Sequence, residues 1–272
     1  MNQTLSLHQP HAWDANVATY ESIAEPFTSR FGSALAERLA IAGGERVIDV
    51  AAGSGALALE LARSGAQVTA VDHSPGMTRR VAERAAEAGL GQRMAAESMD
   101  GQALSFPDGS FDVGLSVFGI MLFPDHEQGL RELVRVVRPG GRVGLGAWRN
   151  PEGAAPGLLL RRAFDRIFPD RDRPQLPAGI RTWSEAAGLR SSMSAAGLVR
   201  IEVSEIAEDW RFPSLDWVAE HADRLFGIMP IWSEADAGDR ESLLGDVLGQ
   251  LERFDGLAVP SPALLATVEK PA

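Results

Sequence analysis

The segment best suited to hold a small ligand combines one acid with two glycines. Asp49 lies near the end of a β-branched run, and the small-residue turn 51–55, which contains Gly53 and Gly55, follows it. A helical pattern begins at Ala56. In this strand–loop–helix order, backbone N–H groups can approach a ligand closely at a helix N-terminus. The acid before the glycines suits a positively charged ligand, such as a nucleoside cofactor with an amino-acid end, better than a pyrophosphate.

A second acid stands where a ribose would be held. Asp72 ends the apolar run 67–71 and follows Gly53 by about 20 residues, the spacing at which an acid accepts hydrogen bonds from a ribose diol. Ser74 and Pro75 then form an N-cap and first-turn pair that opens a helix. The glycine spacing also fits a relaxed dinucleotide pattern, and either acid could instead cap a turn. The helix is expected to bury one face, formed by Met77, Val81, Ala85 and Ala88, and to end at Gly89.

Five segments occur in the order found in one enzyme family. They are 49–55, 71–77, 99–101, 104–113 and 131–141. With them the chain resembles the class I S-adenosylmethionine (SAM)-dependent methyltransferases, in the broad ubiquinone-biosynthesis-like group that acts on small molecules. The resemblance is strong over residues 10–150, moderate over 180–205 and thin elsewhere. It implies SAM as the cofactor and S-adenosylhomocysteine (SAH) as its product.

The resemblance also implies which residues contact the cofactor. Asp49 would meet the ammonium group and Asp72 the ribose, while Asp100 would accept a hydrogen bond from the adenine amine. An aromatic ring and a hydroxyl of the N-terminal segment, Tyr20 and Thr28, would touch the carboxylate. The full set of implied cofactor residues is Tyr20, Thr28, Asp49, Ala51, Gly53, Gly55, Asp72, His73, Met77, Met99, Asp100, Gly101, Val117 and Phe118.

Several of these residues have plain structural alternatives. Met77 and Phe118 would equally serve as buried packing residues, although a polarisable thioether also suits the face of an adenine ring. Asp100 stands in an acidic turn of a common kind. Tyr20 could simply anchor an amphipathic helix together with Trp13. The sequence leaves these pairs of readings open.

The general base is not fixed by the motifs. Of the five histidines, His221 lies in an expected cap helix at 214–226, where it could face an acceptor. It is the candidate catalytic residue, and its alternative is an exposed surface side chain. His126 is interpreted as a solvated residue in the first turn of a helix. A base is required only if the acceptor must lose a proton.

The elements needed to position these residues alternate along the chain. Runs typical of strands occur at 46–51, 67–72, 92–97, 111–117, 142–148, 199–205 and 263–269, separated by helical patterns. They predict an α/β fold, namely a Rossmann-like, doubly wound seven-stranded sheet with its last strand antiparallel and an α-helical cap. We expect an N-terminal helical cap segment (1–45), a SAM-binding core (46–150), a cap insertion (151–182), a core helix with the sixth strand (183–205), a helical cap insertion (206–262) and the last strand with the C-terminus (263–272).

The composition excludes several classes of function. The 272 residues are 45% hydrophobic and 23% charged, as in ordinary globular proteins. A net charge of −11 makes nucleic acid a poor partner. The absence of cysteine excludes disulfides, thiolate catalysis and cysteine-ligated zinc, and we expect no metal. The first ten residues lack the pattern of a secretory signal, and no window is apolar enough for a membrane span. We therefore expect a cytoplasmic monomer or homodimer without a membrane partner.

The expected reaction is transfer of the SAM methyl group to an N, O or C atom of a small acceptor. Five aromatic residues in the cap suggest that this acceptor is apolar or planar, and their alternative role is to pack the cap onto the core: Trp210, Phe212, Trp217, Phe226 and Trp232. One alternative is a SAM-fold protein that uses the cofactor structurally, either as a non-methylating cyclase-type enzyme or as a non-catalytic SAM-binding protein. A nicotinamide enzyme is a weaker alternative, because Asp49 would lie awkwardly beside a pyrophosphate.

Overall fold

A seven-stranded sheet runs through the protein, of which the computed structural model describes residues 8–272. The strand order is β3-β2-β1-β4-β5-β7-β6, in which the pairs from β3 to β5 are parallel and β7 is antiparallel to both neighbours. The predicted fold class is therefore confirmed. The strands are β1 (Arg46–Val50), β2 (Gln67–Asp72), β3 (Met94–Ser98), β4 (Phe111–Val117), β5 (Val137–Trp148), β6 (Glu202–Arg211) and β7 (Ala258–Glu269).

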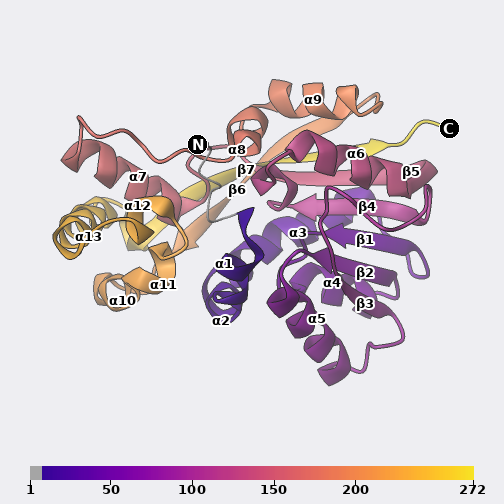
Figure 1. Cartoon of the computed structure of the whole chain (residues 1–272), viewed down its shortest axis with the longest axis horizontal. Coiled ribbons are helices and arrows are strands. Elements are labelled where there is room, and N and C mark those ends of the chain that lie inside the picture. Colours follow the sequence, from indigo (N-terminus) through magenta and orange to yellow (C-terminus); the bar gives the residue numbers. More distant parts are fainter. Residues whose placement is uncertain (1–7) are drawn as a thin grey trace.

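Helices cover both faces of this sheet (Figure 1). On one face α3 (Glu25–Leu39), α4 (Ala56–Arg63) and α5 (Pro75–Glu87) pack over one apolar cluster, and on the other α6 (His126–Val136) and α9 (Ala186–Ala195) pack over a second. Helix α6 begins at the N-cap Asp125, whose side chain accepts a hydrogen bond from the backbone N–H of Gln128. Two layers of helices thus leave the ends of the parallel strands as the open edge of the core.

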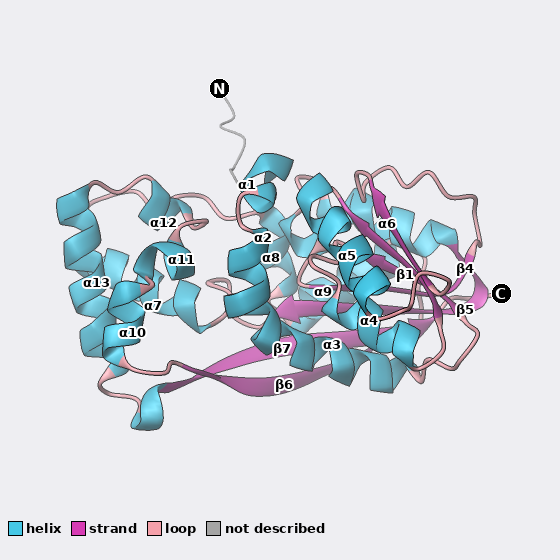
Figure 2. Ribbon diagram, turned by 90° about the horizontal axis from the view of Figure 1, so that it is seen from below, coloured by secondary structure: helices cyan, strands magenta, loops and turns pink. Residues whose placement is uncertain are grey.

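A helical cap lies beyond the core, at the far end of the β6–β7 pair (Figure 2). It consists of α7 (Ala155–Ile167), α10 (Leu215–Glu220), α11 (Ala222–Phe226), α12 (Pro230–Ser233) and α13 (Ala237–Leu251). Between the cap and the core lie α1 (Pro10–Asp14), α2 (Val17–Thr19), the π-helical turn η2 (Tyr20–Ala24) and α8 (Ala178–Trp183). The 3₁₀ turns η3 (Ile120–Leu122) and η4 (Asp255–Leu257) lie after β4 and before β7, respectively. No helix in the described part of the chain has the length and apolarity needed to cross a membrane.

The structure corrects several of the predicted boundaries. The last two strands form a long antiparallel pair, although α10 to α13 lie between them in the sequence. Their pairing starts with Glu202 opposite Thr267 and ends with Arg211 opposite Ala258, so β6 begins and ends later than predicted and β7 begins earlier. Two prolines, at 260 and 262, concealed the start of β7 because proline lacks an N–H for the ladder. They are tolerated because β5 pairs with β7 only as far as Ala263, which leaves this part of β7 with β6 on one side alone.

Smaller corrections concern helix ends and the chain start. The single helix expected at 214–226 is broken at His221 into α10 and α11. Ala88 was expected on the buried face of α5, but the helix ends at Glu87 and Ala88 is exposed. The expectation that the first ten residues are no secretory signal rests largely on residues 1–7, which lie outside the described part of the chain.

Gly55 is required by packing as well as by backbone conformation. It has φ of +85° and forms the N-cap of α4, and a Cβ added there would lie 2.8 Å from Cγ2 of Val81 on α5. We expect Gly55→Ala to lower the free energy of unfolding by about 2 kcal/mol or more, from left-handed strain plus the contact with Val81. Gly89→Ala is the matched control, because Gly89 has φ of +68° with nothing within 4 Å, and should lose only about 1 kcal/mol. Urea denaturation measures both values, and equal losses would contradict the packing explanation.

Candidate functional site

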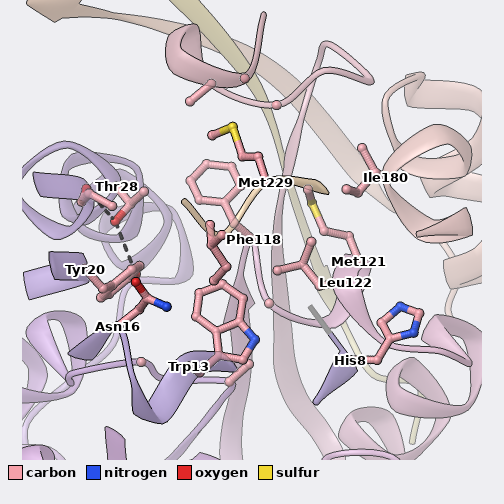
Figure 3. Close-up of a pocket in the computed structure, with 18 of the residues that line it drawn as sticks. His8, Trp13, Asn16, Tyr20, Thr28, Phe118, Met121, Leu122, Ile180 and Met229 are labelled. Atoms are coloured by element: carbon pink, nitrogen blue, oxygen red, sulfur yellow. Dashed lines mark hydrogen bonds between the residues drawn. The ribbon is translucent and has the colours of Figure 1, made fainter. Parts of the chain in front are cut away.

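A cavity of about 700 Å³ lies beyond the carboxyl ends of the parallel strands, between the core, the N-terminal helices and the cap (Figure 3). Its volume falls within the range of small-molecule sites, about 300–1,000 Å³. Open α/β sheets bind ligands at this edge, where the strand order reverses between β1 and β4. The cavity wall includes every predicted cofactor residue except Asp49 and Gly55: Tyr20, Thr28, Ala51, Gly53, Asp72, His73, Met77, Met99, Asp100, Gly101, Val117 and Phe118.

Asp49 is a buried carboxylate at the edge of this cavity. It is 3% exposed and lines a small adjoining hollow, which it shares with Tyr20, Thr28 and Ala51. Within residues 8–272 its side chain has neither a hydrogen-bond donor nor a cation as partner. Burial, and to a lesser extent the charge of Asp72, raise the pKa of Asp49 to about 7. A cationic group bound beside it would therefore be strongly stabilised.

Asp72 is held by backbone amides on both sides of the cavity edge. Its Oδ2 accepts from the N–H of Gly53 at 3.0 Å, and its Oδ1 accepts from the N–H of Ser74 at 2.9 Å. Burial raises the pKa of the Asp72 carboxyl, and these two hydrogen bonds act in the opposite direction. The side chain of Ser74 caps α5 by accepting from the N–H of Met77. Asp72 thus ties the glycine loop to the start of α5 while it faces the cavity.

Two cavity residues have left-handed backbone conformations. Ala51, directly after β1, has φ of 59°, and Phe118, directly after β4, has φ of 60°. A non-glycine residue in this region costs about 1–2 kcal/mol, and such strain is often retained at ligand sites. Because β1 and β4 are neighbours in the sheet, both strained turns meet at the point where the strand order reverses.

The N-terminal helices are fastened over one end of the cavity. Asp14 of α1 accepts from the backbone N–H of Gly76 at 2.7 Å and from the Ser74 hydroxyl at 2.5 Å. Tyr20 and Thr28 point toward one another across the wall, with 3.4 Å between their hydroxyl oxygens (Figure 3). Burial raises the pKa of Tyr20 to about 12, so this phenol remains a neutral donor. The π-helical turn that begins at Tyr20 is a feature often found at functional sites.

The third strand contributes a more open part of the wall. Met99 follows β3, and its N–H donates to the backbone carbonyl of Asp72 at 3.1 Å. Asp100 is exposed and accepts from the backbone N–H of Gln102 at 2.9 Å, as an acid does in a tight turn. Met77 is fully buried and also lines the cavity. Both readings of Met77, as core residue and as cavity wall, are therefore compatible with its place.

The cavity wall opposite the N-terminal helices is mostly apolar. The ring of Phe118 stacks on Trp148 with 3.6 Å between ring centroids, and it also lines the cavity. Opposite the N-terminal helices lie the side chains of Met121, Leu122, Ile180 and Met229 (Figure 3). Phe118 is thus both a packing residue and part of the wall. The surface that it shares with the cap suits an apolar or planar ligand.

The histidine expectations need correction. His221 does not line the cavity: its ring stacks on Trp217 with centroids 4.5 Å apart, and Nδ1 lies 2.9 Å from the Trp217 carbonyl oxygen. It occupies the break between α10 and α11, so its side chain turns back onto its own helix. The structure therefore gives no support to His221 as a base. His126 is buried rather than solvated, because α8 packs on the start of α6 and brings Trp183 against its ring.

Charged residues at the cavity or its adjoining hollow that the sequence did not predict include Glu25, Glu152, Arg161 and Arg224. Glu25 of α3 accepts from the Arg84 guanidinium at 2.8 Å and from the Ser54 hydroxyl, which locks α3, the glycine loop and α5 together. Arg161 of α7 is buried and lines the cap end of the cavity. A signal for Arg161 existed, because it falls one helical turn before the apolar residue Phe164. The adjacent Arg162 is exposed, and two successive arginines are a pattern typical of a solvated helix face.

Comparison with known proteins relates the chain to methyltransferases. A family model described as a methyltransferase domain matches residues 47–141. An uncharacterized protein of Mycobacterium tuberculosis is 39% identical over 187 residues, or 69% of this chain and 64% of that protein. A demethylmenaquinone methyltransferase of Thermus thermophilus is 37% identical over 172 residues, or 58% of this chain and 77% of that protein. The crystal structure of the [4+2]-cyclase SpnF has the same fold, with a TM-score of 0.57 at 23% identity over 89% of this chain and 82% of that chain.

Proposed function

The chain belongs to the class I SAM-dependent methyltransferases, and we propose that it transfers the methyl group of SAM to an N, O or C atom of a small, largely apolar acceptor. The observation that carries the proposal is Asp49, a buried carboxylate without a partner among the described residues, at the edge of a cavity of suitable size. A cationic amino-acid end fits this carboxylate, whereas a pyrophosphate would be repelled by it.

The other cavity residues fit the remaining parts of the cofactor. Asp72 stands at the end of β2, where its carboxylate can accept from the ribose hydroxyls. Met99 and Asp100 at the end of β3 suit the adenine, with Met77 beside them. The hydroxyls of Tyr20 and Thr28 suit the carboxylate that accompanies the ammonium group. On this proposal the cofactor lies across the ends of β1, β2, β3 and β4, and the acceptor enters from the cap.

The protein's contribution to the reaction is positioning and exclusion of water. SAM, when bound, supplies an already activated methyl group, so the chain must orient the acceptor in line with it. Orientation alone contributes up to about 7–11 kcal/mol to lowering such a barrier. Phe118, Met121 and Met229 give the site an apolar wall. Exclusion of water by such a wall would favour a transition state in which the sulfonium charge is spread over the sulfur, the methyl group and the acceptor atom. No base is required for an acceptor that is already nucleophilic.

Methyl-labelled SAM tests the reaction directly. The protein is incubated with labelled SAM and a panel of small apolar and aromatic acceptors, and both labelled product and SAH are measured. We expect label in one or more products with an equal amount of SAH. Binding of SAH without label in any product would instead favour the cyclase-type or non-catalytic alternative. The cyclase-type alternative is retained because the [4+2]-cyclase SpnF has the same fold.

Tyr20→Phe tests the contact proposed for the cofactor carboxylate. The change removes one hydroxyl and keeps the ring that packs against Trp13. We expect SAH affinity to fall about 3- to 10-fold, the value of a single hydrogen bond, with no change in affinity for methylthioadenosine, which lacks the amino-acid end. Calorimetry measures both ligands. An equal loss for the two ligands would mean that Tyr20 acts through the fold of the N-terminal helices.

A further inference from the structure

A single buried guanidinium faces the cap end of the cavity. Arg161 lies in the middle of α7, is 8% exposed and forms part of the cavity wall. Among residues 8–272 no side chain or backbone group forms a hydrogen bond or ion pair with it. The next residue, Arg162, points to solvent. The fold therefore buries one arginine of an adjacent pair, and among the described residues this arginine has no hydrogen-bond or ion-pair partner.

An unpaired buried charge is costly to the folded protein. Burial lowers the pKa of Arg161, and the negative charge of Glu152 only partly opposes this effect. Glu152 also lines the cavity but forms no ion pair with the guanidinium. An arginine stays protonated in proteins, so the positive charge persists in this apolar setting. A group that destabilises the fold yet points into a ligand cavity indicates a partner that arrives with the ligand.

The surroundings of Arg161 define that partner further. The neighbouring wall is formed by apolar side chains of the cap, including Leu160, Leu225 and Ile231. The ligand that fits here has an apolar body and one anionic end. A guanidinium fork matches a carboxylate with two parallel hydrogen bonds and balances its single charge. The negative charge of Glu152, which also lines the cavity, disfavours a phosphate dianion more than a carboxylate with its single charge.

We infer that Arg161 binds a carboxylate of the acceptor, so that the acceptor is an apolar or aromatic carboxylic acid. The inference rests on the proposed function, because it assigns the cap end of the cavity to the acceptor. It places the carboxylate on α7, while the apolar body extends along the wall toward Phe118. The methylated atom then lies on the part of the acceptor remote from the carboxylate, at the cofactor end of the cavity.

Binding of model acids to the SAH-loaded protein tests the assignment. The probes are 2-naphthoate and octanoate, each compared with its neutral amide, in the wild type, Arg161→Gln and the matched surface control Arg162→Gln. We expect both acids to bind the wild type more tightly than their amides do. We expect Arg161→Gln to bind the acids about tenfold or more weakly than the wild type binds them. Arg162→Gln should bind as the wild type does. SAH affinity should be equal in all three proteins.

Three outcomes would overturn the assignment. In the first, the acids bind the wild type no better than their amides do. In the second, the acids bind Arg161→Gln as tightly as the wild type. In the third, the SAH affinity falls in Arg161→Gln while the affinity for the acids does not change. The last outcome would assign Arg161 to the cofactor. Failure of the wild type to bind SAH at all would instead contradict the proposed function, so the two failures are distinguishable.

The stability of the ligand-free protein separates a binding role from a structural one. Arg161→Met keeps the length of the apolar stem and removes the unpaired charge. We expect its melting temperature to rise by about 2 °C or more, because an uncompensated buried charge is removed. Arg162→Met should leave the melting temperature unchanged. A fall in Arg161→Met would show that the guanidinium stabilises the fold and would contradict the inference.

Discussion

In Asp49→Asn, SAH is expected to bind about 30-fold or more weakly than in the wild type at pH 7.5, whereas methylthioadenosine binds equally well. The substitution keeps the shape of the side chain but removes the negative charge proposed to meet the ammonium group. Loss of one partner of a buried charge pair costs ~2 kcal/mol or more in binding. Methylthioadenosine lacks the ammonium group and therefore serves as the matched ligand. Isothermal calorimetry measures both affinities.

The same carboxylate makes cofactor binding depend on pH. Because the pKa of Asp49 is raised to about 7 in the free protein, the group is largely protonated below pH 7, and a bound ammonium must expel that proton. SAH affinity should therefore fall about tenfold for each pH unit below 7. At alkaline pH it should fall again, once the ammonium group of SAH itself loses its proton. Asp49→Asn should abolish the acid limb and retain the alkaline one.

The stability of the free protein should respond in the opposite direction. A carboxyl whose pKa is raised on folding contributes stability that is present below its unfolded value near 3.8 and is lost as the pH rises through 7. Asp49→Asn should thus raise the melting temperature relative to wild type, and by more at pH 8 than at pH 5. Equal loss of SAH and methylthioadenosine, together with a lower melting temperature at both pH values, would instead mean that Asp49 supports the loop.

Most elements of the parallel core could be predicted because they carry a local signal, whereas β3 has little β propensity and could be placed only by its order along the chain. Asp49 and Asp72 end β-type runs, Ser74 and Pro75 mark a helix start, and helix α6 shows its apolar period. The β6–β7 pair could not be placed correctly, because the length of its strands is decided by pairing between segments far apart in the sequence. The prolines at 260 and 262 are atypical of a strand, because proline has no N–H to donate to a neighbouring strand. Only the end of β5 pairing at Ala263 explains why they are tolerated.

The candidate site divides in the same way. The end of the cavity that we propose for the cofactor depends on turns directly after strands, and the sheet brings those turns together. The place of Gly53, Asp72 and Phe118 in the cavity wall could therefore be predicted from spacing and resemblance. The acceptor end depends on which side of each cap helix faces inward. His221 turned back onto Trp217 because the expected helix breaks there, and Arg161 turned inward although its neighbour Arg162 did not. Neither orientation follows from a local pattern.

Asp72→Asn is expected to weaken SAH and methylthioadenosine alike, by about 10- to 100-fold, because both ligands carry the ribose. The asparagine keeps one oxygen that can accept a hydrogen bond, but it loses the second acceptor and the charge that strengthens hydrogen bonds from hydroxyls. The pattern differs from that of Asp49→Asn, which separates the two ligands. The two variants together therefore map which end of the cofactor each acid holds.

Asp72 also accepts hydrogen bonds from Gly53 and Ser74, so a loss of affinity in Asp72→Asn could come from a disturbed loop rather than from the ribose. Adenosine and 2′,3′-dideoxyadenosine distinguish these causes, since they differ only in the diol. In the wild type adenosine should bind about tenfold or more tightly than the dideoxy compound, and in Asp72→Asn the two affinities should become nearly equal. If the ratio of the two affinities is the same in both proteins, Asp72 acts on the loop alone. The ribose would then have to be held by another group of the cavity wall, and His73, the next residue along the chain, is the first to test.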